Sequence, residues 1–172
     1  MPHTVERPTW DLRPEAASDR AFLRAVYADV HGDDFAGFGL PAATQQALFD
    51  HQLAAREQSW RTTHPDGRWS IVEVDGVPAG RLLVSTDATG IRLVDIALLR
   101  EYRGHGLGTA LVTGVVADAD RRRLSVTLHV DRANPARRLY ERLGFVTCAE
   151  DAFRVRMRHE PPGGLENGAS DD

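Results

Sequence analysis

Glycine occupies three alternate positions, Gly104, Gly106 and Gly108, between an apolar segment at residues 91–99 and a helix-like pattern that starts at Leu107. Glycine costs about 1 kcal/mol relative to alanine in a helix interior, so a helix that opens on glycine needs a reason. The first backbone N–H groups of a helix have no partner inside it, and its dipole places about half a positive charge there. The loop is therefore predicted to hold a negatively charged group.

Three interpretations of this loop are open. It can be a tight strand-to-helix turn that uses the backbone freedom of glycine. It can belong to a dinucleotide fold, because Asp131 at the end of the next predicted strand resembles the ribose-binding acid, although the GxGxxG fingerprint requires a glycine where Thr109 stands. The third interpretation is a pyrophosphate cradle, formed by successive N–H groups and the helix dipole.

Composition excludes several classes of protein. A chain of 172 residues suits one domain with a real hydrophobic core. The sequence has no lysine, which excludes a Schiff-base mechanism and the lysine of a GxxxxGK[ST] phosphate loop. A net charge of −4 gives no electrostatic footprint for nucleic acid. Cys148 is the only cysteine, so an internal disulfide and a cysteine-rich zinc site are excluded, and no metal is expected.

The two ends of the chain carry no targeting or membrane signal. The N-terminus has no apolar signal region, and no run approaches the roughly 18 apolar residues of a membrane span. We therefore expect a cytoplasmic protein with no membrane partner. Residues 160–172 are rich in Gly, Pro and acidic residues and have no basic residue. This predicts a single domain over residues 1–159 and a disordered acidic tail over residues 160–172.

Hydrophobic periodicity and turn residues predict the element order β-αα-βββ-α-β-α-β(β), a mixed α/β layer fold. Strands are expected within residues 9–14, 68–86 (a hairpin that turns at Asp75-Gly76), 91–99, 124–130 and 145–158. Helices are expected from Ser18 or Asp19 to about residue 30, from Pro41 to about residue 60, from Leu107 onward, and from Asn134 as N-cap to Gly144 as the stop.

Two segments resemble the GNAT superfamily of N-acetyltransferases. RGHGLG at residues 103–108 matches the family motif [QR]-x-x-G-x-[GA]. DIALLREYRGHGLGTAL (residues 95–111) and LHVDRANPARRLYERLGF (residues 128–145) are similar to the family's fourth strand, third helix, fifth strand and fourth helix, in order. The N-terminal half agrees in element order only. The resemblance implies the GNAT acyl-CoA N-acyltransferase fold, a mixed α/β architecture with a central sheet of six to seven strands, splayed between the fourth and fifth, and about four helices.

The activity that the resemblance implies is acetyl transfer from acetyl-CoA to a primary amine, by direct attack in a ternary complex. It also implies that the end of the fourth strand offers backbone groups to the pantetheine arm, that the glycine loop holds the pyrophosphate, and that the fourth helix contacts the cofactor. The residues at these places are Ile96, Ala97 and Leu98; Arg103, Gly104, His105, Gly106, Leu107, Gly108 and Thr109; and Asn134 and Tyr140.

Three residues are candidates for acid-base catalysis. Tyr140 matches the family tyrosine that protonates the CoA thiolate, and a phenol with a pKa near 10 can donate to such a group; the alternative is that it only packs. His129 stands on the strand where members acting on protein N-termini carry a glutamate base, and a neutral imidazole can accept the amine proton, directly or through water; the alternative is a hydrogen-bonded strand histidine without a catalytic role. Asp95, an acid in an apolar strand, is the other candidate base, unless an arginine makes it a structural partner. Arg92 stands where histone-type members carry their base, so their mechanism does not transfer.

The sequence leaves the acceptor open, and we expect a small-molecule or peptide amine. The rival class is a non-catalytic acyl-CoA-binding or interaction module on the same fold. Family members are often dimers, so a homodimer is one expected assembly, although the sequence does not decide the oligomeric state. A group of acids is expected either to form a solvated face or, because the family's substrate lip lies there, to attract a cationic amine: Asp29, Asp33, Asp34, Asp50 and Glu57.

Overall fold

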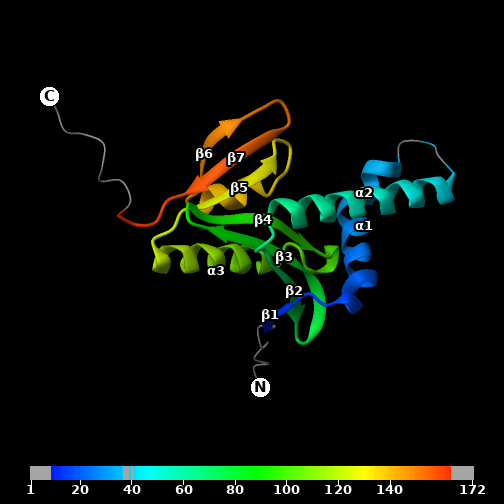
Figure 1. Cartoon of the computed structure of the whole chain (residues 1–172), viewed down its shortest axis with the longest axis horizontal. Coiled ribbons are helices and arrows are strands. Elements are labelled where there is room, and N and C mark those ends of the chain that lie inside the picture. Colours follow the sequence, from blue (N-terminus) through cyan, green and yellow to red (C-terminus); the bar gives the residue numbers. More distant parts are fainter. Residues whose placement is uncertain (1–8, 37–38, 40, 164–172) are drawn as a thin grey trace, which may run out of the picture. The chain divides into compact units, whose positions relative to one another are not determined.

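A computed structural model of the chain describes residues 9–36, 39 and 41–163. Within this range it has seven strands and four α-helices in the predicted order (Figure 1). The strands are β1 (Trp10–Pro14), β2 (Arg68–Val74), β3 (Val77–Asp87), β4 (Gly90–Leu98), β5 (Val126–Asp131), β6 (Val146–Glu150) and β7 (Arg154–His159). The helices are α1 (Arg20–Ala36), α2 (Ala42–Thr63), α3 (Leu107–Arg122) and α4 (Arg137–Arg142), with short 3₁₀ turns at Ala17–Asp19 and Arg100–Tyr102.

The strands form one mixed sheet in the order β1-β2-β3-β4-β5-β7-β6. β1 and β2 are antiparallel, as are β5 and β7, and β6 and β7, whereas β4 and β5 run parallel. The parallel ladder joins residues 91–93 to residues 126–128, and both strands continue beyond it, β4 to Leu98 and β5 to Asp131. A parallel pair requires a crossover connection, which α3 provides here. The predicted mixed α/β fold class is confirmed.

The described residues up to 83, together with residues 95–105, form one compact unit. Its helices α1 and α2 pack through aromatic side chains, because the ring of Tyr27 lies 4.8 Å from that of Phe49, with Leu53 in the same buried cluster. The hairpin of β2 and β3 turns at Asp75 and Gly76, which have φ angles of 50° and 79°. Positive φ at both central positions is what a two-residue type I′ turn requires, so the predicted hairpin is confirmed.

The described residues 84–94 and those from 106 onward form a second compact unit. Within it α3 lies along β5, and apolar side chains of α3 and of the strands are buried: Leu111, Val112, Val115, Val126, Leu128, Val155 and Met157. Buried and more exposed residues alternate along β5 and β7, as expected for strands with one face on a core. The second face of these strands is therefore free to carry polar side chains.

Two helix boundaries differ from the prediction. α1 runs to Ala36 rather than to about residue 30. α4 begins at Arg137 with Ala136 as its N-cap, not Asn134. Asn134 still caps this end of the helix, because its Oδ1 accepts a hydrogen bond from the Ala136 N–H at 2.9 Å and its carbonyl accepts one from Arg137 at 3.1 Å. The chain therefore enters α4 through a tightened first turn.

Two predictions concern the C-terminal part of the chain, the stop of α4 at Gly144 and the tail over residues 160–172. Gly144 ends α4 with a φ of 85°, so the predicted stop is confirmed. Of the predicted tail, residues 160–163 lie within the described part, where Glu160 pairs with Arg158 at 2.5 Å. Residues 164–172 lie outside the described residues.

Candidate active site

The glycine loop owes its shape to two left-handed residues. Gly104 has a φ of 79° and Gly106 a φ of 85°, and a Cβ built on either would meet nothing within 4 Å. A side chain would therefore have room at both positions, and crowding does not explain the glycines. The positive φ explains them, because glycine adopts it without strain. Gly106 is the N-cap of α3 and offers no side chain to cap it. The loop is thus built to leave the start of α3 uncapped.

Several backbone N–H groups in this loop make no hydrogen bond to protein. Over the part of the chain that the structure describes, none is formed by the amides of residues 104–109, and the first bonded amide is that of Ala110, which donates to the Gly106 carbonyl at 2.9 Å. Residues 104–106 and Thr109 are exposed, Gly108 is half-buried and Leu107 is buried. Unpaired amides at a helix N-terminus form a site for phosphate groups. The pyrophosphate-cradle interpretation fits this arrangement.

Arg103, the predicted phosphate-binding arginine, is anchored within the first unit. Its Nε donates to the Leu98 carbonyl at 2.8 Å, and its Nη2 donates to Asp29 Oδ2 at 2.8 Å. The Asp29 carboxylate also accepts from the Arg100 N–H at 2.5 Å. Asp29 on α1 therefore holds both ends of the turn that leads into the glycine loop. The sequence placed Asp29 in a group of acids that form either a solvated face or a substrate lip, and no local signal marks a contact between residues 74 positions apart.

The end of β4, where the pantetheine arm is expected, is held tightly by β3. A Cβ added to Gly80 would lie 2.3 Å from the Ala97 carbonyl oxygen and 2.6 Å from Leu98 Cδ2. The Leu99 N–H donates to the Ala79 carbonyl at 2.9 Å. Glycine at position 80 is thus required by close approach of two backbones. This packing fixes the position of residues 96–98.

Asp95 has a structural arginine partner, which was the alternative to its role as a base. Arg81, whose side chain is 5% exposed, donates from Nε to Asp95 Oδ2 at 3.0 Å. The same guanidinium donates from Nη1 to Glu57 Oε1 at 3.3 Å and lies over the ring of Trp60, 5.0 Å from its centroid. A buried cation is thereby balanced by two carboxylates. No signal in the sequence marked Arg81, because it is a single polar residue within a predicted hairpin strand.

His129 lies among arginines on β5. Its Nδ1 accepts a hydrogen bond from Nη2 of Arg92, so the neutral ring carries its proton on Nε2. Partial burial lowers the pKa of His129, and the charges of Arg92, Arg156 and Arg154 lower it further. The imidazole is therefore neutral near pH 7, but the nitrogen that could take a proton is engaged by a cation.

Tyr140 and Asn134 belong to the same unit as His129. Tyr140 is 6% exposed, and its ring meets Phe145 edge-on with centroids 5.8 Å apart. Tyr140 therefore packs as the alternative prediction expected. Its role as the acid stays a prediction, and the burial of the ring is compatible with a hydroxyl that donates away from bulk water. Asn134 uses the oxygen of its side chain to cap α4.

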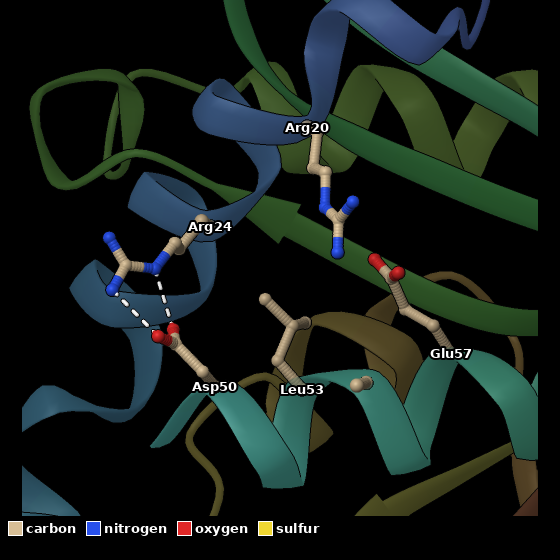
Figure 2. A pocket seen from close by; sticks show the side chains of 6 residues that line it. Arg20, Arg24, Asp50, Leu53 and Glu57 are labelled. Atoms are coloured by element: carbon tan, nitrogen blue, oxygen red, sulfur yellow. Dashed lines mark hydrogen bonds and ion pairs between the residues drawn. The ribbon is translucent and has the colours of Figure 1, made fainter. Parts of the chain in front are cut away.

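A pocket of about 260 Å³ lies between α1 and α2 in the first unit. Figure 2 shows the residues that line it: Arg20 and Arg24 from α1, and Asp50, Leu53 and Glu57 from α2. Arg24 and Asp50 form a two-bond pair, with distances of 2.6 and 2.9 Å. The guanidinium of Arg20 and the carboxylate of Glu57 face each other across the remaining space. Two of the acids predicted for a substrate lip, Asp50 and Glu57, therefore line a charged pocket.

The described part of the chain shows neither a cluster of metal ligands nor a membrane-spanning helix. The described residues contain no group of three or more His, Cys, Asp or Glu side chains arranged to hold a metal ion. Among the helices in the described ranges, none combines the length and apolar character needed to cross a bilayer.

Comparisons with known proteins find relatives of this chain both in sequence and in structure. A mycothiol acetyltransferase of Nocardiopsis dassonvillei is 33% identical over 178 residues, which cover 91% of this chain and 52% of that protein. The chain therefore spans about half the length of this curated relative. The crystal structure of PaiA N-acetyltransferase from Thermoplasma acidophilum in complex with coenzyme A has the same fold, with a TM-score of 0.66, 16% identity, and coverage of 88% of this chain and 99% of that one.

A second solved structure is more similar in sequence. Nourseothricin acetyltransferase is 30% identical over 57% of this chain and 67% of its own, with a TM-score of 0.51. The family model of the acetyltransferase (GNAT) family matches residues 23–145, a range that holds the glycine loop, β4, β5 and α4. The chain belongs to the GNAT acetyltransferase family.

Proposed function

We propose that this protein transfers the acetyl group of acetyl-CoA to a primary amine, by direct attack of the amine in a ternary complex. The observation that carries the proposal is the run of unpaired backbone amides at residues 104–109, opened by two left-handed glycines at the start of α3. Such amides, together with the helix dipole, suit the pyrophosphate of CoA. The solved relative that contains coenzyme A has the same fold.

The predicted cofactor-binding residues and the predicted acid, Tyr140, each have a role in this reaction. Residues 96–98 of β4 orient the thioester arm with backbone groups, and Asn134 contacts the same arm. The amine nitrogen forms a bond to the thioester carbonyl carbon, the C–S bond breaks, and the thiolate sulfur takes a proton. Tyr140 donates that proton, because a phenol is neutral near pH 7 and a thiolate with a conjugate pKa near 8.5 is a suitable acceptor.

The proton on the attacking amine needs a second acceptor. For a lysine-like amine with a pKa of about 10.4, deprotonation at pH 7.4 costs roughly 4 kcal/mol, and for an α-amine with a pKa of about 8 it costs less than 1. Nδ1 of His129 is engaged by Arg92, and Oδ2 of Asp95 is engaged by Arg81. We therefore assign the amine proton to water.

The acceptor that we propose is a small polar amine. The charged pocket between α1 and α2 suits a polar ligand rather than an apolar one, because its lining includes Arg20 and Glu57 facing each other. The relatives point the same way, since their names give mycothiol and nourseothricin as the compounds concerned.

A thiol-release assay tests this function. Purified protein is mixed with acetyl-CoA and a panel of primary amines, free CoA is measured with a thiol reagent, and the acetylated amine is identified by mass. Release that depends on the amine, with one acetyl group gained per thiol, is the expected result. Calorimetric binding of acetyl-CoA without thiol release on any amine would instead favour the non-catalytic acyl-CoA-binding module.

A further inference from the structure

Polar residues of β4, β5 and β7 share the face of the sheet that is turned away from the core of the second unit. Arg92 is paired in register with Thr127, and His129 with Arg156. Their chain neighbours Leu93 and Leu128, and Met157 beside Arg156, are at most 3% exposed. Because side chains alternate between the two faces of a strand, Arg92, His129 and Arg156 lie together on the opposite face. We call these three residues the cationic triad.

Among the described residues Asp151 faces His129, but no carboxylate pairs with the two arginines of the triad. Arg154, the next arginine on this face, pairs with Asp131 at 3.6 Å. Neither Arg92 nor Arg156 has a carboxylate partner among residues 9–36, 39 and 41–163. Arg92 is half-buried, and its pKa is lowered by burial and by the charge of Arg156. A partly buried cation without a counter-ion is costly, so its presence needs a reason outside the chain itself.

The triad offers hydrogen-bond donors only. The two guanidinium groups are donors without acceptor atoms, and His129 uses Nδ1 to accept from Arg92, which leaves its Nε2–H as a donor. Planar guanidinium groups match anions with several oxygens, bidentately in the best cases. The complement of such a surface is a carboxylate or a phosphate.

We propose that the cationic triad of Arg92, His129 and Arg156 binds an anionic group, carboxylate or phosphate, carried by the acceptor amine. This inference rests on the proposed acetyl transfer, because it names the class of acceptor: a primary amine with an anionic substituent. It also gives His129 a different part from the base predicted for it. The imidazole donates from Nε2 to the anion and positions Arg92 through Nδ1.

A binding experiment tests the triad without any catalysis. The titration of His129 is followed by NMR, with inorganic phosphate or acetate at constant ionic strength set by chloride. Charged groups facing His129 are Arg92 on β4, Arg154 and Arg156 on β7, and Asp151 before β7. A bound anion stabilises the protonated ring, so the titration midpoint should rise by at least 0.5 pH unit, and the probe that raises it more identifies the preferred anion.

Matched variants separate the triad from general charge effects. Arg156→Gln removes an exposed arginine of the triad, and Arg68→Gln removes an exposed arginine at the start of β2. The anion-induced rise should be lost in Arg156→Gln and kept in Arg68→Gln. An unchanged midpoint with both probes in the wild-type protein, or an equal rise in both variants, overturns the site.

Kinetics with paired acceptors tests the link to acetyl transfer. O-Phosphoethanolamine is compared with ethanolamine, and β-alanine with β-alaninamide, so that each pair differs in one anionic group. In at least one pair, kcat/KM of the wild-type protein should favour the anionic acceptor at least tenfold. Arg156→Gln should reduce this preference to threefold or less. The KM for acetyl-CoA should change less than twofold in the same variant. Acetylation of the neutral amines with equal or better efficiency overturns the inference and leaves the proposed function in place. Absence of thiol release with every amine refutes the proposed function itself, and with it the assignment of the anion to an acceptor.

Discussion

Replacing Gly108 by valine should weaken acetyl-CoA binding at least tenfold. Gly108 lies in the first turn of α3, within the run of unpaired amides at residues 104–109. Its φ is not among the positive ones, so valine fits the backbone without strain, unlike at Gly104 or Gly106. A hydrogen bond to a charged group contributes about 1.5–3 kcal/mol, and a branched side chain at the entrance should keep the pyrophosphate from at least one amide. The loss of one such bond corresponds to a tenfold rise in Kd, about 1.4 kcal/mol.

The same helix supplies a matched control. Gly114 is exposed, and a Cβ added there meets nothing within 4 Å, so Gly114→Val makes the same substitution away from the loop. Gly114→Val should keep the wild-type melting temperature or gain slightly, because valine is a somewhat better helix former than glycine, and the melting temperature of Gly108→Val shows whether that variant is folded. Isothermal calorimetry with acetyl-CoA gives the Kd of each. A wild-type Kd in folded Gly108→Val, or an equal loss in Gly114→Val, would refute the cradle and return the loop to a simple strand-to-helix turn.

Three other variants test Tyr140 as the general acid, Arg81 as a buried cation, and the contribution of Asp19 to stability at low pH. Tyr140→Phe should lower kcat about 100-fold, as expected for loss of a general acid, with the Kd for acetyl-CoA within a few-fold; near-full kcat would mean that solvent protonates the thiolate. Arg81→Met should destabilise the protein by about 3 kcal/mol in urea unfolding, because it leaves carboxylates at Asp95 and Glu57 without their buried partner. The pKa of Asp19 is lowered to about 2 by its hydrogen bond from Arg13, so its stabilising effect is complete above about pH 4–5 and is lost as the pH falls through about 2. Unfolding free energies measured between pH 5 and 2 should therefore fall less steeply in Asp19→Asn.

Local patterns were sufficient to predict most of the fold. The Asp75-Gly76 turn, the apolar run of β4 and the spacing of buried residues along α3 each specify an element without reference to the rest of the chain. The boundary of α4 was placed wrongly because the Asn-Pro pair resembles a helix start, whereas in the structure the asparagine caps a tight turn before the helix begins. A cap residue and a first helical residue carry the same sequence signal, so only the backbone distinguishes them.

The partners of the site residues could not be predicted in this way. Asp29 holds Arg103 across 74 positions, and Arg81 joins acids 24 positions before it and 14 after it. Such pairs depend on where helices are placed beside strands, which neither periodicity nor a motif specifies. His129 shows the consequence, because the sequence identified a titratable group on β5 but not the arginine that engages its Nδ1. A residue's chemical role follows from its neighbours more than from its own type.

The assignment of the amine proton to water leads to a pH dependence set by the acceptor. Without a base on the enzyme, kcat/KM should rise tenfold per pH unit up to the pKa of the acceptor's own amine. For two acceptors with pKa values of about 8 and 10.4, the half-maximal points should differ by about 2.4 pH units. His129→Gln should leave both midpoints in place, because they belong to the acceptor amine and not to the imidazole that glutamine replaces. An acidic limb near pH 6–7 that is shared by both acceptors, and that disappears in His129→Gln, would show that the imidazole takes the proton despite its hydrogen bond from Arg92.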